Sequence, residues 1–264
     1  MLFALFMSFT DWNIMSKPHW VGLSNYKELF TDSAFFEILK NTLVFSMIYV
    51  SGALVIGLLL AVLVNTKVKG VRFFRAAYFT PVVTSAVAVG IVWGWILSPK
   101  YGVLNYFLEH WLHINSPSWL GDQKWALLTV AFVQTWKMVG YYMIIFLAGL
   151  QSIPRQLYEA ARIDGASKHQ AFWKITLPLL SPTTFFVFTI AIIDSFRNFE
   201  IIYTMTQGGP QYASTTLVYA VYLNAFVFYR MGYASAMAYV LLTIVGLLTL
   251  LNFILKKYWV KNVY

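Results

Sequence analysis

Long apolar stretches alternate with shorter polar segments along the chain. Five of the stretches are long enough to cross a bilayer as a helix, which takes about 20 mostly apolar residues. They cover residues 42–64, 76–98, 125–149, 183–206 and 234–255. Because lipid offers no partner for backbone polar groups, open segments at this depth must be helical. The pattern predicts an all-α fold, a polytopic transmembrane helix bundle.

The first nine residues form a sixth apolar stretch that is too short to span. As a helix they would rise only about 14 Å, roughly half of a hydrocarbon core. They lack the basic start and the cleavage site of a signal peptide. Since residues 10–41 are expected outside, we interpret residues 1–9 as the end of a truncated first span. A short interfacial anchor is the alternative. The predicted bundle thus has five complete spans and the end of a truncated first span. Together they form one domain over residues 1–264.

The charged residues indicate how the chain is oriented. Hydrophobic residues make up 59% of the chain and charged residues only 11%, yet the formal net charge is +9. Cations gather in alternate inter-span segments and the tail: Lys67, Lys69, Arg72, Arg75, Arg155, Arg162, Lys168, Lys174, Lys256, Lys257 and Lys261. The positive-inside rule places these segments and the C-terminus in the cytoplasm. The charge therefore reflects membrane topology, and no nucleic-acid partner is expected.

A polar helix-turn-helix pattern occupies the cytoplasmic loop before the fourth predicted span. Ser152 is expected to cap a first helix, which Asp164 and Gly165 end. Ser167 with Gln170 forms a capping box that opens a second helix. The loop is thus predicted to form two ordered short helices that can pack against another surface.

Three short elements of this loop resemble a known motif. Glu159-Ala160-Ala161, Gly165 and Ile175-Thr176-Leu177-Pro178 resemble the EAA motif of the membrane-spanning subunits of bacterial ABC importers, with that family's spacing. The resemblance implies that residues 150–182 form a coupling loop, which docks in a groove on a separate ATPase. The coupling residues are then expected to be Glu159, Ala160, Ala161, Asp164, Gly165, Ile175, Leu177 and Pro178. A loop that packs only on its own bundle is the alternative.

Further segments resemble the carbohydrate-uptake branch of that family, in particular its maltose and glycerol-3-phosphate type first permease. They are "SFTDWN" (8–13), "VGLSNY" (21–26), "TQGGPQYASTTLVYAVY" (206–222) and "YRMGYASAMAYVL" (229–241). The resemblance implies import of a sugar through the bacterial inner membrane. The implied partners are an ABC ATPase dimer, a second homologous permease and an extracytoplasmic sugar-binding protein. No Walker-type GxxxxGK[ST] loop occurs in the sequence, so ATP and magnesium are expected on the partner ATPases, with no cofactor bound by this chain.

Polar residues inside two spans are candidates for the substrate path. Ionisable groups at membrane depth are costly and usually face a cavity or one another. Lys137 and Arg197 would favour an acidic saccharide unless Asp194 and Glu200 neutralise them; Arg197 has a partner at helical spacing on either side.

By resemblance, the sugar pocket falls on Gln134, Met138, Tyr141, Ala191, Ser195 and Asn198, beside Asp194. Tyr141 and Asn198 keep the family's residue type, whereas the other four positions differ from the maltose permeases. This argues against maltose and favours another oligosaccharide or a related polyol.

Two other classes of protein are considered. A stand-alone ion-coupled secondary transporter could relay protons through Asp194 and Glu200, but no internal repeat supports it. An intramembrane enzyme would need catalytic motifs, and neither HExxH nor GxSxG occurs in the sequence. We therefore expect a non-catalytic subunit without a metal site. The free cysteine and disulfide chemistries are excluded because the chain has no cysteine.

Overall fold

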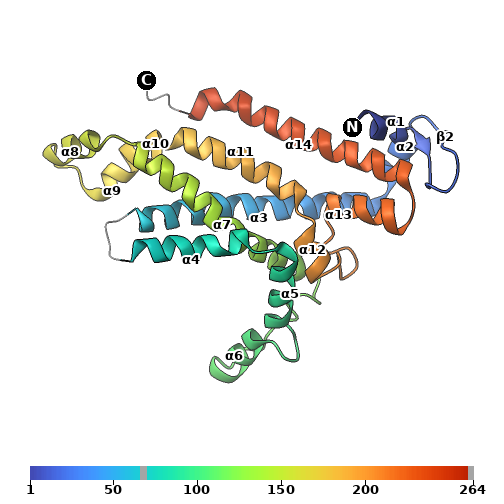
Figure 1. Cartoon of the computed structure of the whole chain (residues 1–264), viewed down its shortest axis with the longest axis horizontal. Coiled ribbons are helices and arrows are strands. Elements are labelled where there is room, and N and C mark those ends of the chain that lie inside the picture. Colours follow the sequence, from blue (N-terminus) through green and yellow to red (C-terminus); the bar gives the residue numbers. More distant parts are fainter. Residues whose placement is uncertain (66–69, 261–264) are drawn as a thin grey trace. The chain divides into compact units, whose positions relative to one another are not determined.

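The computed structural model describes residues 1–65 and 70–260, so the predicted cytoplasmic cations Lys67, Lys69 and Lys261 lie outside the described residues. Most of the described chain is helical and it has almost no strands, which confirms the predicted fold class (Figure 1). Its helices are α1 (Leu2–Ser8), α2 (Ser24–Thr31), α3 (Ser33–Val64), α4 (Val71–Val83), α5 (Ala86–Ile96), α6 (Val103–Trp111), α7 (Ala126–Ser152), α8 (Arg155–Ile163), α9 (Lys168–Ala171), α10 (Leu177–Leu179), α11 (Ser181–Arg197), α12 (Glu200–Met205), α13 (Leu217–Tyr222) and α14 (Met231–Trp259). Two π-helices, η1 (Phe172–Thr176) and η2 (Leu223–Val227), and an antiparallel ribbon of β1 (Thr10–Asp11) and β2 (His19–Trp20) complete it.

Three helices of the described chain, α3, α7 and α14, are each long and apolar enough to cross a membrane. Two further candidates qualify only as interrupted pairs: α4 with α5, and residues 168–179 with α11. Counting each pair as one span gives up to five spans, the number that the sequence predicts. The short helix α1 covers the segment that was interpreted as the end of a first span, and that interpretation stays a prediction.

The fourth predicted span is not one continuous helix. It breaks after Arg197, and α12 begins at Glu200. At the break, Phe199 occupies the N-cap position of α12, and its ring packs into an aromatic cluster. Its ring-centroid distances are 5.4 Å to Tyr203, 5.9 Å to Tyr219 and 5.0 Å to Tyr222. Packing with residues about 20 positions away therefore overrides local helix propensity. Arg197 and Glu200 consequently do not form a pair on one helix.

The second predicted span is interrupted. Proline inside a helix usually kinks or breaks it, but α4 continues past Pro81 to Val83, and α5 begins at Ala86. A helix end leaves carbonyl groups without intrahelical partners. Here the buried ammonium group of Lys137 donates to the carbonyl oxygen of Val82 at 3.2 Å. A partner distant in the sequence thus stabilises the break. The position of the break could therefore not be predicted from Pro81 alone.

The chain forms two compact units that alternate along the sequence. The first unit comprises Met1–Ile48, Ser85–Gln134 and Asp194–Leu247, and the second comprises Tyr49–Thr84, Thr135–Ile193 and Leu248–Tyr264. Four of the five divisions fall inside α3, α7, α11 and α14, and the fifth lies between α4 and α5, so no single cut of the chain separates the units. One domain over the whole chain stays a prediction. The buried core cluster of the first unit is Leu29, Phe35, Ile38, Leu217, Ala220, Tyr233 and Met237.

Small residues let helices of the second unit approach closely. A Cβ added to Gly57 of α3 would lie 3.1 Å from the Cβ of Tyr142 in α7. Beside it, the hydroxyl groups of Tyr49 and Tyr142 are hydrogen-bonded at 3.0 Å. A Cβ on Gly149 of α7 would lie 2.4 Å from the Oγ1 of Thr183 in α11. These glycines act in helix packing, which is their usual role in membrane bundles.

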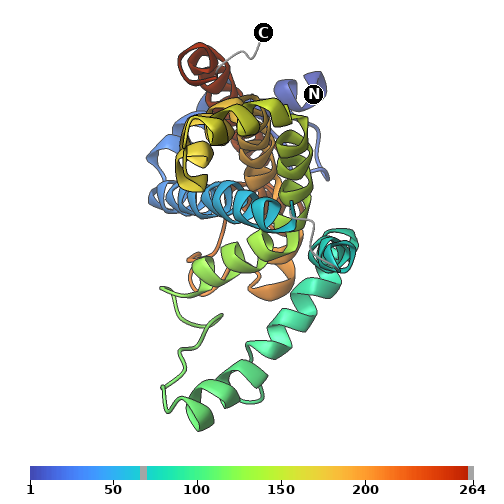
Figure 2. The same cartoon turned by 90° about the vertical axis from the view of Figure 1, so that its left-hand side faces the viewer.

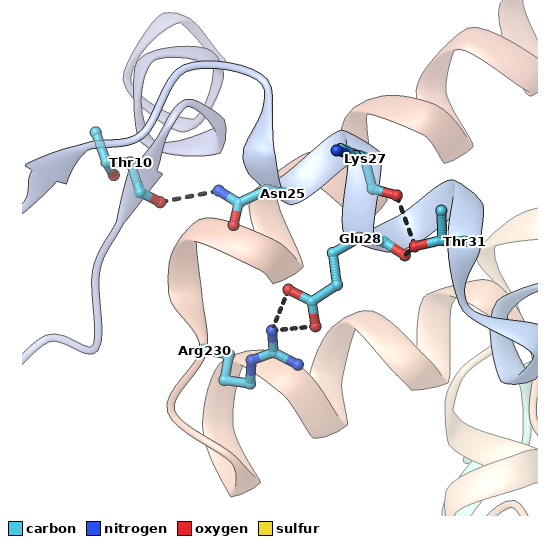
Figure 3. Close-up of polar contacts among 6 residues, drawn as sticks. All are labelled: Thr10, Asn25, Lys27, Glu28, Thr31 and Arg230. Carbon is cyan, nitrogen blue, oxygen red and sulfur yellow. Dashed lines mark hydrogen bonds and ion pairs between the residues drawn. The ribbon is translucent and has the colours of Figure 1, made fainter.

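Within the first unit, residues 8–31 fold over the start of α14; we call this segment the N-terminal clasp (Figure 3). The side-chain amide of Asn25 donates to the carbonyl oxygens of Ser8 and Thr10 at 2.8 and 2.9 Å. Arg230 donates to both carboxylate oxygens of Glu28 at 2.6 and 2.7 Å. The two charged side chains are 45% and 50% exposed, so water screens this ion pair and it contributes little stability.

The close backbone approach at Gly232 matters more to the clasp than the ion pair does. A Cβ at this position would lie 1.8 Å from the carbonyl oxygen of Thr10, and the Gly232 N–H donates to the carbonyl of Trp12 at 3.2 Å. We expect Gly232→Ala to destabilise the first unit by about 1–3 kcal/mol, because backbone atoms would have to move apart. Thermal unfolding and limited proteolysis in nanodiscs measure this loss.

Gly94→Ala is the matched control for this substitution. It lies in α5, and an added Cβ there meets no heavy atom within 4 Å. Its stability should equal or slightly exceed that of the unmodified protein, since alanine favours helix. Equal stability and protease resistance of Gly232→Ala and Gly94→Ala would contradict the role given to the close approach.

Candidate functional site

The first helix of the predicted coupling loop, α8, begins later than expected. The sequence predicts Ser152 as its cap, but Ser152 is the last residue of α7 and its hydroxyl donates to the carbonyl of Gly149 at 2.8 Å. Pro154 occupies the N-cap position of α8 instead. A residue that precedes proline is disfavoured in helical geometry, so Ile153 separates the two helices. The predicted cap is therefore wrong, although the helix it was meant to open is present.

The turn that ends α8 forms as predicted. Gly165 has φ +78°, a backbone conformation that glycine adopts freely and that is strained for most residues with a Cβ atom. Its N–H donates to the carbonyl of Arg162 at 3.1 Å, and the N–H of Ala166 donates to that of Ala161 at 2.9 Å. These two bonds make a Schellman motif, which satisfies carbonyl groups at the helix end. The capping box is also confirmed: Ser167 and Gln170 exchange backbone and side-chain hydrogen bonds.

The second helix of the loop is not regular. Four α-helical residues pass into the π-helix η1, in which the N–H of Leu177 reaches back to the carbonyl of Phe172. Pro178 has no N–H, and its ring crowds the carbonyl four residues earlier, so a wider turn before it relieves the clash. π-helices are frequent at functional sites. A hydrogen bond of 2.8 Å between the hydroxyl groups of Tyr158 and Thr176 joins η1 to α8.

The loop exposes charged and apolar side chains together. Glu159 and Ala160 are exposed on α8, and Ile163 at its end is 88% exposed. Trp173 of η1 is exposed as well. Ile163 lies outside every candidate span of the described chain, and an exposed apolar surface in such a place is typical of a protein-docking surface. Figure 2, which turns this end toward the viewer, shows α8 and the helix after it as two short helices joined by a turn.

Four of the eight predicted coupling residues gather around the inner angle of this turn. A cavity of about 370 Å³ lies there, and its lining includes Ala161, Asp164, Gly165 and Ile175. Leu177 and Pro178 are half-buried in α10, beyond the cavity. The structure therefore divides the motif into an exposed edge at Glu159 and a group of residues around the cavity, a distinction that the sequence did not make.

The predicted substrate-path residues lie on one side of each of their helices. Gln134, Met138 and Tyr141 recur at steps of four and three along α7, and all are half-buried. Ala191 and Ser195, four residues apart on α11, are buried, as is Asn198 directly after that helix; Asp194 is half-buried. Gln134, Asp194, Ser195 and Asn198 belong to the first unit, and Met138, Tyr141 and Ala191 to the second.

Asn198 differs from the other path residues in its hydrogen bonding. Its side chain is 4% exposed, and its Nδ2 group has no hydrogen-bond acceptor in the described part of the chain. A buried polar group in this condition is rare and calls for an explanation. The unsatisfied state of this amide could not be predicted from the residue type, because the burial of Asn198 depends on the break between α11 and α12. An amide of this kind can donate to a hydroxyl group of a ligand.

Comparison with known proteins adds the following. Residues 53–262 match the family model described as binding-protein-dependent transport system inner membrane component. The chain is 39% identical to a probable ABC transporter permease protein of Bacillus subtilis, YesP, over 97% of this chain and 84% of that protein. It is 37% identical to the multiple sugar-binding transport system permease protein MsmF of Streptococcus mutans, over 96% of this chain and 87% of that protein.

A solved structure agrees with these relatives in fold. A chain of a bacterial ABC transporter involved in the import of the acidic polysaccharide alginate superimposes with a TM-score of 0.87 at 26% identity. The match covers 98% of this chain and 89% of that one. The protein thus belongs to the binding-protein-dependent transport system inner membrane components, the permease subunits of ABC transporters.

Proposed function

We propose that this permease forms half of the translocation path of an ATP-driven importer for a sugar or oligosaccharide, in the bacterial inner membrane with its C-terminus in the cytoplasm. The observation that carries the proposal is the loop of α8, η1 and α10, where the EAA pattern lies on an ordered helix pair with an exposed apolar edge. The named relatives support a saccharide as substrate, since one is a multiple sugar-binding system and another imports alginate.

Coupling would run through the exposed edge of α8. ATP and magnesium would bind to a partner ATPase dimer, and closure of that dimer would move the docked loop. A loop transmits motion only if it moves as one body. Here the Schellman motif, the capping box and the Tyr158–Thr176 hydrogen bond hold the two short helices together. This chain would itself catalyse no reaction.

The path for the sugar would include the polar side chains of α7 and those at the end of α11. The buried amide of Asn198 and the half-buried hydroxyl of Tyr141 would bond to sugar hydroxyl groups. An extracytoplasmic sugar-binding protein and a second homologous permease would complete the importer. Family membership favours this assembly over a stand-alone secondary transporter and over an intramembrane enzyme.

Docking of the ATPase should depend on the backbone conformation at residue 165. Gly165→Val would force a β-branched residue to positive φ, at a cost of roughly 1–2 kcal/mol, and reorient the turn. Asparagine tolerates this conformation, so Gly165→Asn is the matched control. Tagged chains purified from native membranes should lose roughly tenfold in recovered ATPase with Gly165→Val and remain near the original level with Gly165→Asn.

Reversal of the charge of Glu159 at the exposed edge tests the docking of the ATPase by the same co-purification. Glu159→Arg leaves the fold of the loop intact, because this exposed side chain lies outside the cavity at the turn. It should nevertheless reduce recovery of the ATPase. Full recovery with both Glu159→Arg and Gly165→Val would show that the loop packs only on its own bundle.

Sugar uptake should depend on Asn198 and Tyr141. Loss of one hydrogen bond to a neutral hydroxyl group costs about 0.5–1.5 kcal/mol, so each alanine variant should raise the KM for transport roughly threefold to tenfold. Uptake by proteoliposomes that contain the whole importer measures this. Asn224→Ala is the control, since that amide donates to the carbonyl of Ala220 in α13. Unchanged kinetics in both Asn198→Ala and Tyr141→Ala would remove these residues from the path.

A further inference from the structure

A polar cleft of about 590 Å³ lies in the second unit, where α3 and α7 end and α4 and α8 begin. Its polar lining among the described residues consists of Asn65, Arg75, Gln151, Arg155 and Tyr158. The buried side chains of Leu150 and Ile153 complete the lining. Two of the lining side chains are arginines and none is a carboxylate. We call this site the arginine cleft; it is separate from the cavity at the inner angle of the coupling loop.

Arg75 is held in place while part of its guanidinium group remains available. One of its Nη2 hydrogens is donated to the carbonyl of Val64, at the end of α3, at 2.9 Å. The Nε group is buried and has no acceptor among the described residues. A guanidinium group has five N–H donors and pairs best with planar carboxylate or phosphate oxygens. Because Nε is buried, a ligand in the cleft would meet the Nη groups, and these donors favour an anion.

The beginning of α8 adds a second, independent source of positive potential. This helix has nine residues, and Arg155 is the first of them. No side chain caps its N-terminus, and no acidic residue lies in its first turn. Unsatisfied N–H groups and the helix dipole together favour an anion at this end. The N-terminus of α8, Arg155 and Arg75 thus favour the same type of ligand.

We propose that the arginine cleft binds the phosphate group of an anionic phospholipid. Phosphate matches the arginine donors, and the cleft lies at the ends of α3 and α7, two helices of membrane-spanning length. Basic pockets between such helices on the cytoplasmic side recruit anionic lipids. The choice of leaflet rests on the topology proposed above, whereas the anion site itself does not.

The position of the cleft gives bound lipid a specific effect. Arg155 lies one helical turn before Glu159 on α8, so the same helix lines the cleft and carries the coupling motif. A phosphate group held by Arg75 and Arg155 would fix the start of α8 against the ends of α3 and α4. Lipid composition would in this way bias the orientation of the coupling helix.

The test uses the purified full chain in detergent, without any ATPase, so that it is independent of the proposed function. Native mass spectrometry measures binding of phosphatidylglycerol and, as the neutral comparison, of phosphatidylcholine. We expect Arg155→Gln to weaken phosphatidylglycerol binding about tenfold by loss of a charge-assisted hydrogen bond, with phosphatidylcholine unaffected. Arg162→Gln removes the same charge from the same helix outside the cleft and should leave binding unchanged.

A second variant tests the guanidinium of Arg75 without removing its charge. Arg75→Lys keeps a cation near the carbonyl of Val64 but loses the planar fork, so phosphatidylglycerol should again bind several-fold more weakly. Equal weakening by Arg155→Gln and Arg162→Gln, or no weakening by Arg155→Gln, would overturn the site. If millimolar inorganic phosphate displaces phosphatidylglycerol and stabilises the chain equally against heat, the phosphate site holds and the lipid assignment is overturned.

Discussion

The satisfaction of backbone polar groups at helix breaks is the constraint on which most of this structure depends. In apolar surroundings, a carbonyl or N–H group that loses its helical partner needs another partner. At the end of α4 the ammonium of Lys137 supplies it, and at the end of α8 the Schellman motif does. The capping box of Ser167 does the same at the start of α9. At these three places a helix can therefore end or begin without leaving the backbone groups unsatisfied.

This constraint explains why the coupling loop can act as a rigid element although its helices are short. Isolated helices of fewer than about 12 residues are marginal in water. In the loop, the Schellman motif and the capping box close the turn between the two helices, and the Tyr158 hydroxyl links the two halves. The exposed edge is then free to carry Glu159 and Ile163 toward a partner without a role in holding the loop together.

Local signals explain what the sequence could predict. Apolar length located the spans, and the residues Gly165, Ser167 and Gln170 located the turn, because each acts within four positions of itself. The breaks at residues 84–85 and 198–199 were missed because they depend on contacts distant in the chain: Lys137 with Val82, and Phe199 with the tyrosines of α13. The π-helix before Pro178 was missed for another reason, since proline permits either a kink or a widened turn.

The sequence predicted which residues belong to the substrate path, but not how their side chains are arranged in space. Spacing along α7 places three of its residues on one face, which the helix confirms. Whether those side chains meet the residues of α11 depends on the two units, and helical periodicity contains no information on that. The one physical sign of a ligand on this path, the buried amide of Asn198, follows from the break after α11. It could not have been inferred from residue type alone.

For the arginines too, the charge pattern in the sequence does not determine which side chains meet in the structure. The positive-inside rule treats Arg75, Arg155 and Arg162 alike, since it places the segments of all three in the cytoplasm. The structure distinguishes them: Arg75 is anchored to the carbonyl of Val64, Arg155 begins an uncapped helix, and Arg162 lies in the last turn of α8 outside the cleft. Arg75 and Arg155 are 80 positions apart in the sequence, so their meeting in one cleft is a property of the fold. Orientation in the membrane requires only the charges, whereas recognition of a phosphate group requires this geometry as well.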